Sequence, residues 1–540
     1  MQKELLVGLH NLPSRSDDNC HNAFCRSVGG KTRSFLVTMA MIMGWAIPAA
    51  AESANGTTIP VATEIVDSHG AIWTLRLSDR EVLKDGRRTG AVNVLQLWYL
   101  DHAVWAYFGG YWWRWDEQWQ TSGATFTWPA KPNMPTTPGL RLSVGPQKGV
   151  SCTGVAVIPG DNIQRIVDAH PAGTTYCLAV GVHNQQSVVP KSGDQFIGAF
   201  DGTNGVVLDG QGTTARAFSG NAAYVVIRNL FIKNYTAPTQ YGTIEVTGAY
   251  LLLQHNDISQ AKRGSGVYVA DHALVIANRL HHNAQQGYAV HGDIIRRPIV
   301  GVLFDSNEID NNNPTQQIWN GSEQGGGKAL NTQYLTFWYN YSHHNGGANF
   351  WTDWNNIFTI YWYNKVGKGW NGIEHEISYN ASIIGNVISD VDAGAGCLNG
   401  YFTCGAINIE NSGGATGVYA GIIEIAYNTI TVPRYGRAIP MRQQNRGVGD
   451  RYSPGEYRWL RNIYVHHNTI DWSAATGVPN GQIGAVQDTG DAKIFHNNIR
   501  FDYNTYIQGA RINQFTWNNR NNNSFTQWQA YGFDLHGSAR

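Results

Sequence analysis

The chain has 540 residues, of which only 14% are charged, while 61 are glycine and 12% are aromatic. Its 39 basic and 39 acidic residues balance, so no overall charge attracts nucleic acid or an anionic membrane surface. The low charge content argues against a disordered polymer, and the length exceeds that of one ordinary domain unless the chain repeats.

Residues 1–51 are expected to be a leader that contains a secretory signal peptide. Two basic residues precede an apolar run from Ser34 to Ile47, and a small-residue cleavage pattern ends at Ala51. The run is short for a membrane span, although a membrane anchor is the alternative. We therefore expect a secreted or periplasmic protein with no membrane span after signal removal.

The next segment, residues 57–128, predicts a small antiparallel β module. Short apolar and aromatic stretches alternate with Asp-Gly and Gly-Gly turn signals. Its tryptophans could stack on sugar rings, which would make the module carbohydrate-binding, or they could fill its own core. These residues are Trp98, Trp105, Trp112, Trp113, Trp115 and Trp119. A Pro-rich linker over residues 129–150 is expected to follow.

The remaining residues, 151–540, begin with a short amphipathic helix in "PGDNIQRIVDAHPAGTTYC". Asp161 is the expected N-cap, and Ile163, Ile166 and Val167 fall on one face. A single helix followed only by strands is expected to cover one end of their core.

Four cysteines remain after the leader, an even number that predicts disulfides in an exported chain. The expected pairs are Cys152–Cys177 and Cys397–Cys404. Four buried thiols are the alternative, because the chain is large enough to fold without covalent links.

A repeat follows, in which an apolar strand is succeeded by Asn, any residue and usually an aliphatic one. The repeated asparagines are Asn229, Asn256, Asn278, Asn307, Asn340, Asn364, Asn386, Asn428, Asn468 and Asn497. The shortest separation is 22 residues (278 − 256), a period typical of a solenoid built from strands. Asn tolerates a left-handed turn, and its amide can bond to the Asn of the next repeat, so we expect a ladder of stacked asparagines.

The helical cap ending in "PAGTTYCLAVG", the following "VVLDGQ" and the repeated Asn motif resemble right-handed parallel β-helix proteins of the pectin-lyase-like superfamily. The resemblance covers roughly residues 155–530. It implies an all-β chain: a right-handed parallel β-helix with an N-terminal helical cap, preceded by the small antiparallel module. It also implies a polysaccharide partner, and we expect a monomer without an organic cofactor. Because that superfamily includes lyases, hydrolases, epimerases and non-catalytic adhesins, the fold does not select a reaction.

The ladder asparagines serve as a ruler for the chemistry. Lys328, Asp353 and Glu376 lie 12, 11 and 10 residues before the asparagines of their repeats (340 − 328, 364 − 353, 386 − 376). Adjacent strands of a β-helix stack about 4.8 Å apart, so we expect these side chains to form one vertical column. His291 could extend the column at one end, and Glu410 or Asn411 at the other.

Two further residues are expected beside this column. In "GIEHEISY", Glu374 and Glu376 alternate with His375, so both carboxylates point to one side of the strand. Trp351 precedes Asp353 by the same two positions and could offer a face for sugar stacking.

The favoured interpretation is β-elimination in a uronic-acid polysaccharide. Lys328 would abstract the proton, with Arg442 or His375 as the acid. Ca²⁺ would neutralise the substrate carboxylate, and its ligands would be Asp353, Glu374 and Glu376. The Glu-x-Glu pattern is similar to the metal site of β-helix lyases that use a lysine base.

Two alternatives remain open. Asp353 and Glu376 could be the acid/base pair of a glycoside hydrolase, with Lys328 binding substrate. The repeats could instead form the stalk of a non-catalytic, polysaccharide-binding adhesin. The dipeptides His343-His344 and His466-His467 are interpreted as turn residues rather than metal ligands, since adjacent residues of a strand face opposite ways.

Overall fold

A computed structural model describes the chain from residue 51 to 540, except 55–56, 60–61, 63, 77–80, 92–93, 95, 101, 109–110, 122–136, 294–296, 315–323, 393–404, 450, 478–480 and 489–496. The predicted leader therefore lies outside the described residues, apart from Ala51. Cys397 and Cys404 lie outside them as well. None of the described helices is long and apolar enough to cross a membrane.

The Trp-rich segment forms two antiparallel sheets, as its turn signals predict. One contains β1 (Thr58–Ile59), β6 (Gln96–Leu100), β7 (Ala103–Phe108), β8 (Tyr111–Asp116) and β9 (Gln118–Thr121). The other contains β2 (Ile65–Val66), β3 (Ile72–Arg76), β4 (Glu81–Lys84) and β5 (Arg87–Arg88). Trp73 is fully buried, with the rings of Trp115 and Trp119 centred 5.1 and 6.0 Å away. Trp73 belongs to the core of this module, and Trp115 and Trp119 pack against that core. A carbohydrate-binding role for this module stays a prediction.

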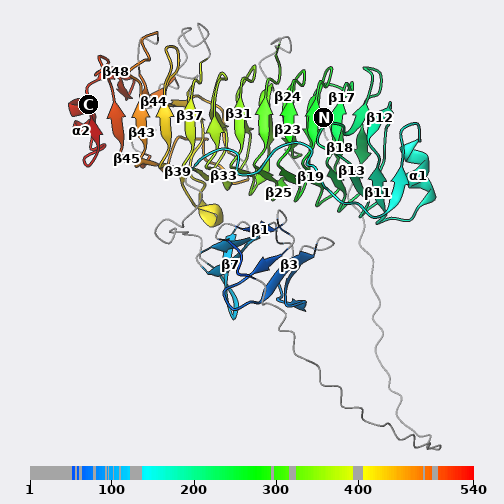
Figure 1. The fold of residues 1–540 in the computed structure, drawn as a ribbon. Helices are drawn as coiled ribbons and strands as arrows, with labels where there is room; N and C mark the ends of the chain where they lie inside the picture. The colour runs from blue at the N-terminus through cyan, green and yellow to red at the C-terminus, as the bar shows by residue number, and fades with distance from the viewer. Residues whose placement is uncertain are drawn as a thin grey trace, which may run out of the picture. The chain divides into compact units, whose positions relative to one another are not determined.

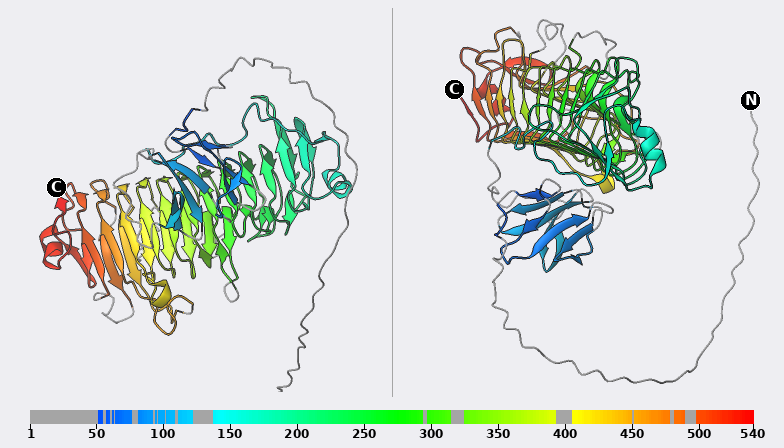
Figure 2. Two further views of the ribbon diagram at one scale, coloured as in Figure 1. Left: turned by 90° about the horizontal axis from the view of Figure 1, so that it is seen from below. Right: turned by 45° about the vertical axis from the view of Figure 1, so that its right-hand side comes forward.

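The rest of the chain winds into a parallel β-helix whose successive rungs stack side by side between α1 (Ile163–Ala169) and α2 (Phe525–Ala530) (Figures 1 and 2). Sheet 1 contains β10 (Val155–Val157), β11 (Thr175–Leu178), β13 (Gln195–Gly198), β16 (Val226–Arg228), β19 (Leu252–Gln254), β22 (Leu274–Ile276), β26 (Leu303–Asp305), β30 (Thr336–Trp338), β33 (Thr359–Trp362), β36 (Ala381–Ile384), β39 (Ile423–Ala426), β42 (Ile463–His466) and β45 (Ile499–Asp502).

Sheets 2 and 3 complete each rung. Sheet 2 contains β12 (Gly181–Asn184), β14 (Val206–Asp209), β17 (Phe231–Lys233), β20 (Asp257–Ser259), β23 (Arg279–His281), β27 (Glu308–Asp310), β31 (Tyr341–His343), β34 (Lys365–Val366), β37 (Val387–Ser389), β40 (Thr429–Thr431), β43 (Thr469–Asp471), β46 (Thr505–Ile507) and β49 (Ser538–Ala539). Sheet 3 contains β15 (Phe218–Gly220), β18 (Gly242–Val246), β21 (Ser265–Tyr268), β24 (Gln286–His291), β28 (Gly325–Leu330), β32 (Phe350–Asp353), β35 (Ile373–Glu376), β38 (Ile407–Glu410), β41 (Ile439–Gln443), β44 (Ile483–Gln487), β47 (Phe515–Trp517) and β48 (Arg520–Asn523).

Outside these sheets lie the short pair β25 (Ile299–Val300) and β29 (Thr332–Gln333), and the 3₁₀ turn η2 (Gly417–Tyr419). The pairings within the three sheets are parallel, except that β47 and β48 run antiparallel. The interior is a continuous apolar core of mainly aliphatic side chains. The predicted all-β parallel β-helix is therefore confirmed.

The helix α1 covers the first rung, with Ile163 and Val167 fully buried. Its N-cap is Asn162, whose side chain accepts from the backbone N–H of Arg165, so the expectation of Asp161 is wrong by one residue. Cys152 and Cys177 form the predicted disulfide.

The asparagine ladder exists, and its side chains lie in the interior. The backbone N–H and the Nδ2 of Asn340 both donate to Oδ1 of Asn364, at 2.9 and 3.1 Å. The same pattern links Asn256, Asn278, Asn307, Asn340, Asn364, Asn386, Asn428, Asn468 and Asn504, and ends on Asp534. A second ladder of the same kind links Asn283, Asn312 and Asn345, which follow strands of sheet 2.

Three details of the predicted ladder are wrong. Asn504, not Asn497, follows Asn468, and Asn229 accepts from the backbone N–H of Gln147 instead of joining the ladder. The left-handed residue is the one before the ladder asparagine, for example Tyr339 with φ 52°. The asparagine is needed for its buried amide rather than for its backbone.

Residues 139–149 lie along the β-helix, although this stretch belongs to the predicted linker. The backbone N–H of Gly139 donates to Tyr363 O, and Arg141 forms an ion pair with buried Asp305. The segment is therefore anchored to the β-helix at the ends of two strands of sheet 1, β26 and β33.

Candidate active site

Side chains of sheet 3 alternate between the interior and the outer face, and the outer face carries the predicted chemistry. In β32, Phe350 and Thr352 are fully buried, whereas Trp351 and Asp353 are partly exposed. In β35, Ile373 and His375 are fully buried, and Glu374 and Glu376 share the face of Asp353.

Acidic residues from three successive rungs form one column on this face. Asp353 is the register partner of Glu376, Glu376 is that of Glu410, and Glu410 is that of Arg442. His291 lies further along the same line, because it pairs with Leu330, the partner of Asp353. The structure thus places five of the predicted site residues in one column, including Arg442, which the sequence could not align.

Lys328 lies in the neighbouring column, which corrects the expectation that it stacks on Asp353 and Glu376. Its register partner is Trp351, and the partner of Trp351 is Glu374. The side chain nevertheless reaches across the face. Its Nζ lies 2.8 Å from Asp353 Oδ2 and 3.7 Å from the centre of the Trp351 ring. Because Lys328 is only 3% exposed, its charge is held by Asp353 and the indole rather than by water.

Three polar residues of this face were missed by the sequence reasoning. Arg446 Nη1 lies 3.0 Å from Glu376 Oε1. Asn371 Nδ2 donates to Glu374 at 2.8 Å, and Asn408 pairs with Glu374 in register. Counting along the repeat could have found Asn408. Arg446 follows β41 in an irregular segment, so no period of the sequence locates it.

The crowding of carboxyl groups changes their protonation. Burial, followed by the charges of Asp353 and Glu410, raises the pKa of Glu376 to about 7, although Arg446 and Lys328 act to lower it. Burial, followed by Glu376 and Glu410, raises the pKa of Glu374 well above its ordinary value. The pKa of Glu410 is raised by burial, with Arg442 acting against it. At pH 7 about half of the Glu376 side chains therefore carry a proton, beside the ion-paired Asp353.

The two histidines that were predicted near the column, His375 and His291, both have lowered pKa values. His375 points into the interior, where its ring nitrogens bond to Thr352 Oγ1 and Tyr379 O, each at 2.8 Å. Burial lowers the pKa of His375 to about 4, so its predicted role as a proton donor to substrate is wrong. Burial and the charge of Lys328 likewise lower the pKa of His291 to about 4. Arg442 is bound to Asp488 at 2.7 Å.

The donor chemistry of this face suits a hard cation such as Ca²⁺. Oδ1 of Asp353 and Oδ1 of Asn408 are buried without a hydrogen-bond partner among the described residues. Glu374 and Glu376 supply further oxygens on the same side of their strand. Within the described residues, sets of three possible metal ligands with donor atoms less than 4.8 Å apart occur only on sheet 2. The carboxyl groups of sheet 3 would therefore have to move closer together to bind an ion.

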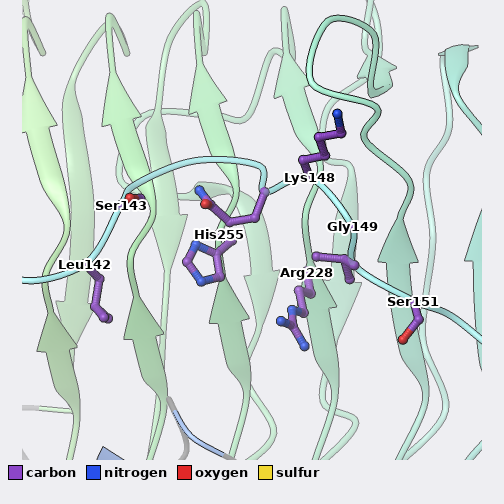
Figure 3. A pocket seen from close by; sticks show the side chains of 9 residues that line it. Leu142, Ser143, Lys148, Gly149, Ser151, Arg228 and His255 are labelled. Carbon is purple, nitrogen blue, oxygen red and sulfur yellow. The ribbon is translucent and has the colours of Figure 1, made fainter. Parts of the chain in front are cut away.

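A separate cavity of about 470 Å³ lies on sheet 1, where residues 142–151 pass over β16 and β19 (Figure 3). Its walls include Arg228 and His255, and the described residues leave Arg228 Nε without a hydrogen-bond partner. This cavity does not include any residue of the acidic column.

No protein-family model and no curated protein matches the sequence. Solved structures with a similar fold include the A-module of the mannuronan C-5 epimerase AlgE6 from Azotobacter vinelandii, at 13% identity and a TM-score of 0.40, covering 73% of this chain and 96% of that one. A mannuronic acid specific family 6 lyase from human gut microbiota is 11% identical, with a TM-score of 0.38 and coverage of 71% and 90%. Pectate lyase Pel9A is 13% identical, with a TM-score of 0.32 and coverage of 63% and 78%. These similarities extend to the fold alone, and the chemistry has to be argued from the side chains.

Proposed function

We propose that the protein hydrolyses glycosidic bonds of a polysaccharide on the outer face of sheet 3. The observation that supports this most is the register pairing of Asp353 with Glu376, each held by its own cation. Strands of adjacent rungs lie about 4.8 Å apart, close to the separation of about 5 Å found between paired carboxyl groups in retaining glycosidases.

The environments of the two carboxyl groups assign their roles. Glu376, with a pKa of about 7, keeps its proton near neutrality and can donate it to the glycosidic oxygen as the bond to the anomeric carbon breaks. Asp353, ion-paired with Lys328, supplies the carboxylate that attacks the anomeric carbon or activates water.

The neighbouring column positions the sugar. The indole of Trp351 lies on the same face of β32 as Asp353, and the side of the ring away from Lys328 can contact a pyranose ring. Lys328 fixes the carboxylate of Asp353 through its ion pair. A site with this many carboxyl groups suits a neutral sugar better than an anionic one.

Metal-assisted elimination is the second candidate, and the unpartnered oxygens of Asp353 and Asn408 favour it. In that case Asp353, Glu374 and Glu376 would hold Ca²⁺, which would neutralise the carboxylate of a uronic acid. Lys328 would then have to leave Asp353 to abstract a proton. We infer export from the cell for either activity, because Cys152 and Cys177 form a disulfide.

A panel of neutral and uronic-acid polysaccharides separates the candidates. Hydrolysis produces new reducing ends without an unsaturated uronate, and we expect this result to persist in the presence of a calcium chelator. Unsaturated ends that vanish on chelation would replace the proposal with elimination. Binding of polysaccharide with neither product would replace it with an adhesin.

Two variants test the assignment of residues. Glu376→Gln and Asp353→Asn should each lower kcat by about 10²-fold or more, because each removes one acid/base group. Glu424→Gln is the matched control, since Glu424 is a partly exposed glutamate on β39 of sheet 1. Equal losses in all three variants would mean that the assignment is wrong.

A further inference from the structure

The outer face of sheet 2 carries a group of metal-ligating side chains that the proposed hydrolysis does not use. His281 ends β23, which is labelled in Figure 1. Its register partner on the next rung is Asp310 of β27. His282 follows His281 directly. The donor atoms of His281, His282 and Asp310 all lie within 4.8 Å of one another.

The backbone explains why two adjacent histidines meet. Adjacent residues in an extended strand face opposite ways, but His282 has φ 54°. This left-handed turn brings its ring back beside that of His281, with 2.7 Å between the two Nδ1 atoms. The interpretation of such dipeptides as turn residues is therefore incomplete, because the turn itself assembles a pair of donors.

Asp257 sets the tautomer of His281. Its Oδ1 lies 2.9 Å from His281 Nε2, and a carboxylate can only accept, so Nε2 carries the proton. A neutral imidazole then presents the lone pair of Nδ1 toward His282. A carboxylate that orients a histidine through its distal nitrogen is the usual support of a metal-binding imidazole.

We propose that His281, His282 and Asp310 bind one divalent transition ion of the zinc class. Two imidazole nitrogens and one carboxylate oxygen form a donor set suited to Zn²⁺ or Co²⁺ and unlike the all-oxygen set of Ca²⁺. Asp310 is almost fully buried, which holds its carboxylate in place, and His282 is exposed, which leaves a path for the ion.

Arg279 competes with the ion for Asp310. Its Nε lies 3.1 Å from Asp310 Oδ1, and its Nη2 lies 3.2 Å from Oδ2. A bound cation would share Asp310 with this guanidinium, whose positive charge opposes binding. Glu308, Asp310 and His343 form an overlapping set, but it has one nitrogen donor, and His343 Nε2 already lies 3.2 Å from Glu308.

The test is a titration of the metal-free full chain with Co²⁺ or Zn²⁺ alone. Binding is measured by calorimetry and, for Co²⁺, by its visible absorption spectrum. We expect one equivalent to bind with a spectrum of mixed nitrogen and oxygen ligation. His282→Gln should abolish it, and Asp257→Asn, which removes the orienting carboxylate, should weaken it by about tenfold. Arg279→Met should tighten it, because the competing charge is gone.

His467→Gln is the matched control. His466 and His467 have the same contact between Nδ1 atoms, at 2.8 Å, and His466 Nε2 also meets a carboxylate, that of Glu424. Within the described residues this pair lacks a third donor at 4.8 Å. Binding that survives His467→Gln supports the proposal. The proposal would be overturned if the unaltered chain did not bind the ion, or if binding were lost in His343→Gln but not in His282→Gln. Equal melting temperatures of the metal-free variants show that each of them is folded.

Discussion

Replacing Glu376 by glutamine keeps the size and hydrogen bonding of the side chain but removes its ionisation. In the folded protein the carboxyl group has a pKa of about 7, against 4.5 for the ordinary side chain. The folded state therefore binds the proton more tightly than the unfolded state does. This contribution to stability is fully present below pH 4.5 and is lost as the pH rises to about 7.

The magnitude follows from the same two values. Each pH unit between them corresponds to about 1.36 kcal/mol, so ionisation of Glu376 costs about 3 kcal/mol above pH 7. The side chain is 10% exposed, so solvent screens little of this cost. Glu376→Gln should therefore be more stable than the unaltered protein at pH 8, by up to about 3 kcal/mol, and equally stable at pH 4.

The assay is urea unfolding of both proteins at several pH values between 4 and 8, together with pH profiles of activity. We expect kcat/KM of the unaltered protein to fall above pH 7 as Glu376 loses its proton, and the variant to be nearly inactive at every pH. A variant that is destabilised at pH 8, or one that retains activity with the same pH profile, would refute the reasoning. Glu424→Gln should leave both measurements unchanged.

Three further predictions concern the surroundings of this site and the scaffold. Arg446→Met removes a cation that lowers the pKa of Glu376, so the fall in kcat/KM should move to higher pH, and an unmoved or acid-shifted profile would contradict the ion pair. Asn340→Ala leaves buried ladder partners unsatisfied and should lower the free energy of unfolding by about 2 kcal/mol or more in a urea titration, whereas no loss would mean that the ladder is dispensable. The double variant Cys152→Ser, Cys177→Ser removes a disulfide between residues with a sequence separation of 25, and it should lower the free energy of unfolding by about 3 kcal/mol. The reference is the oxidised parent under non-reducing conditions, and equal stability of the two proteins would mean that the disulfide does not stabilise the fold.

Much of the fold could be predicted from the sequence because each rung repeats a local requirement. An apolar strand followed by Asn340 or Asn364 has to bury both its aliphatic face and its amide, and stacked rungs satisfy the two at once. The same period places Asp353 and Glu376 on one face, since both positions are measured from neighbouring asparagines. These features depend on short-range pattern, which a single chain displays directly.

Other features were decided by the tertiary structure, because register depends on turns and bulges whose lengths the repeat does not encode. Counting along the repeat predicts that Lys328 stacks on Asp353, but in the pairing of β28 with β32 its partner is Trp351, two residues earlier. The ammonium still reaches Asp353 because the lysine side chain is long. Arg446 reaches Glu376 from an irregular segment. The left-handed turn at His282 unites neighbours that an extended strand would separate. The sequence by itself determined the repeat and the face, and the three-dimensional path of the turns decided which charges meet there.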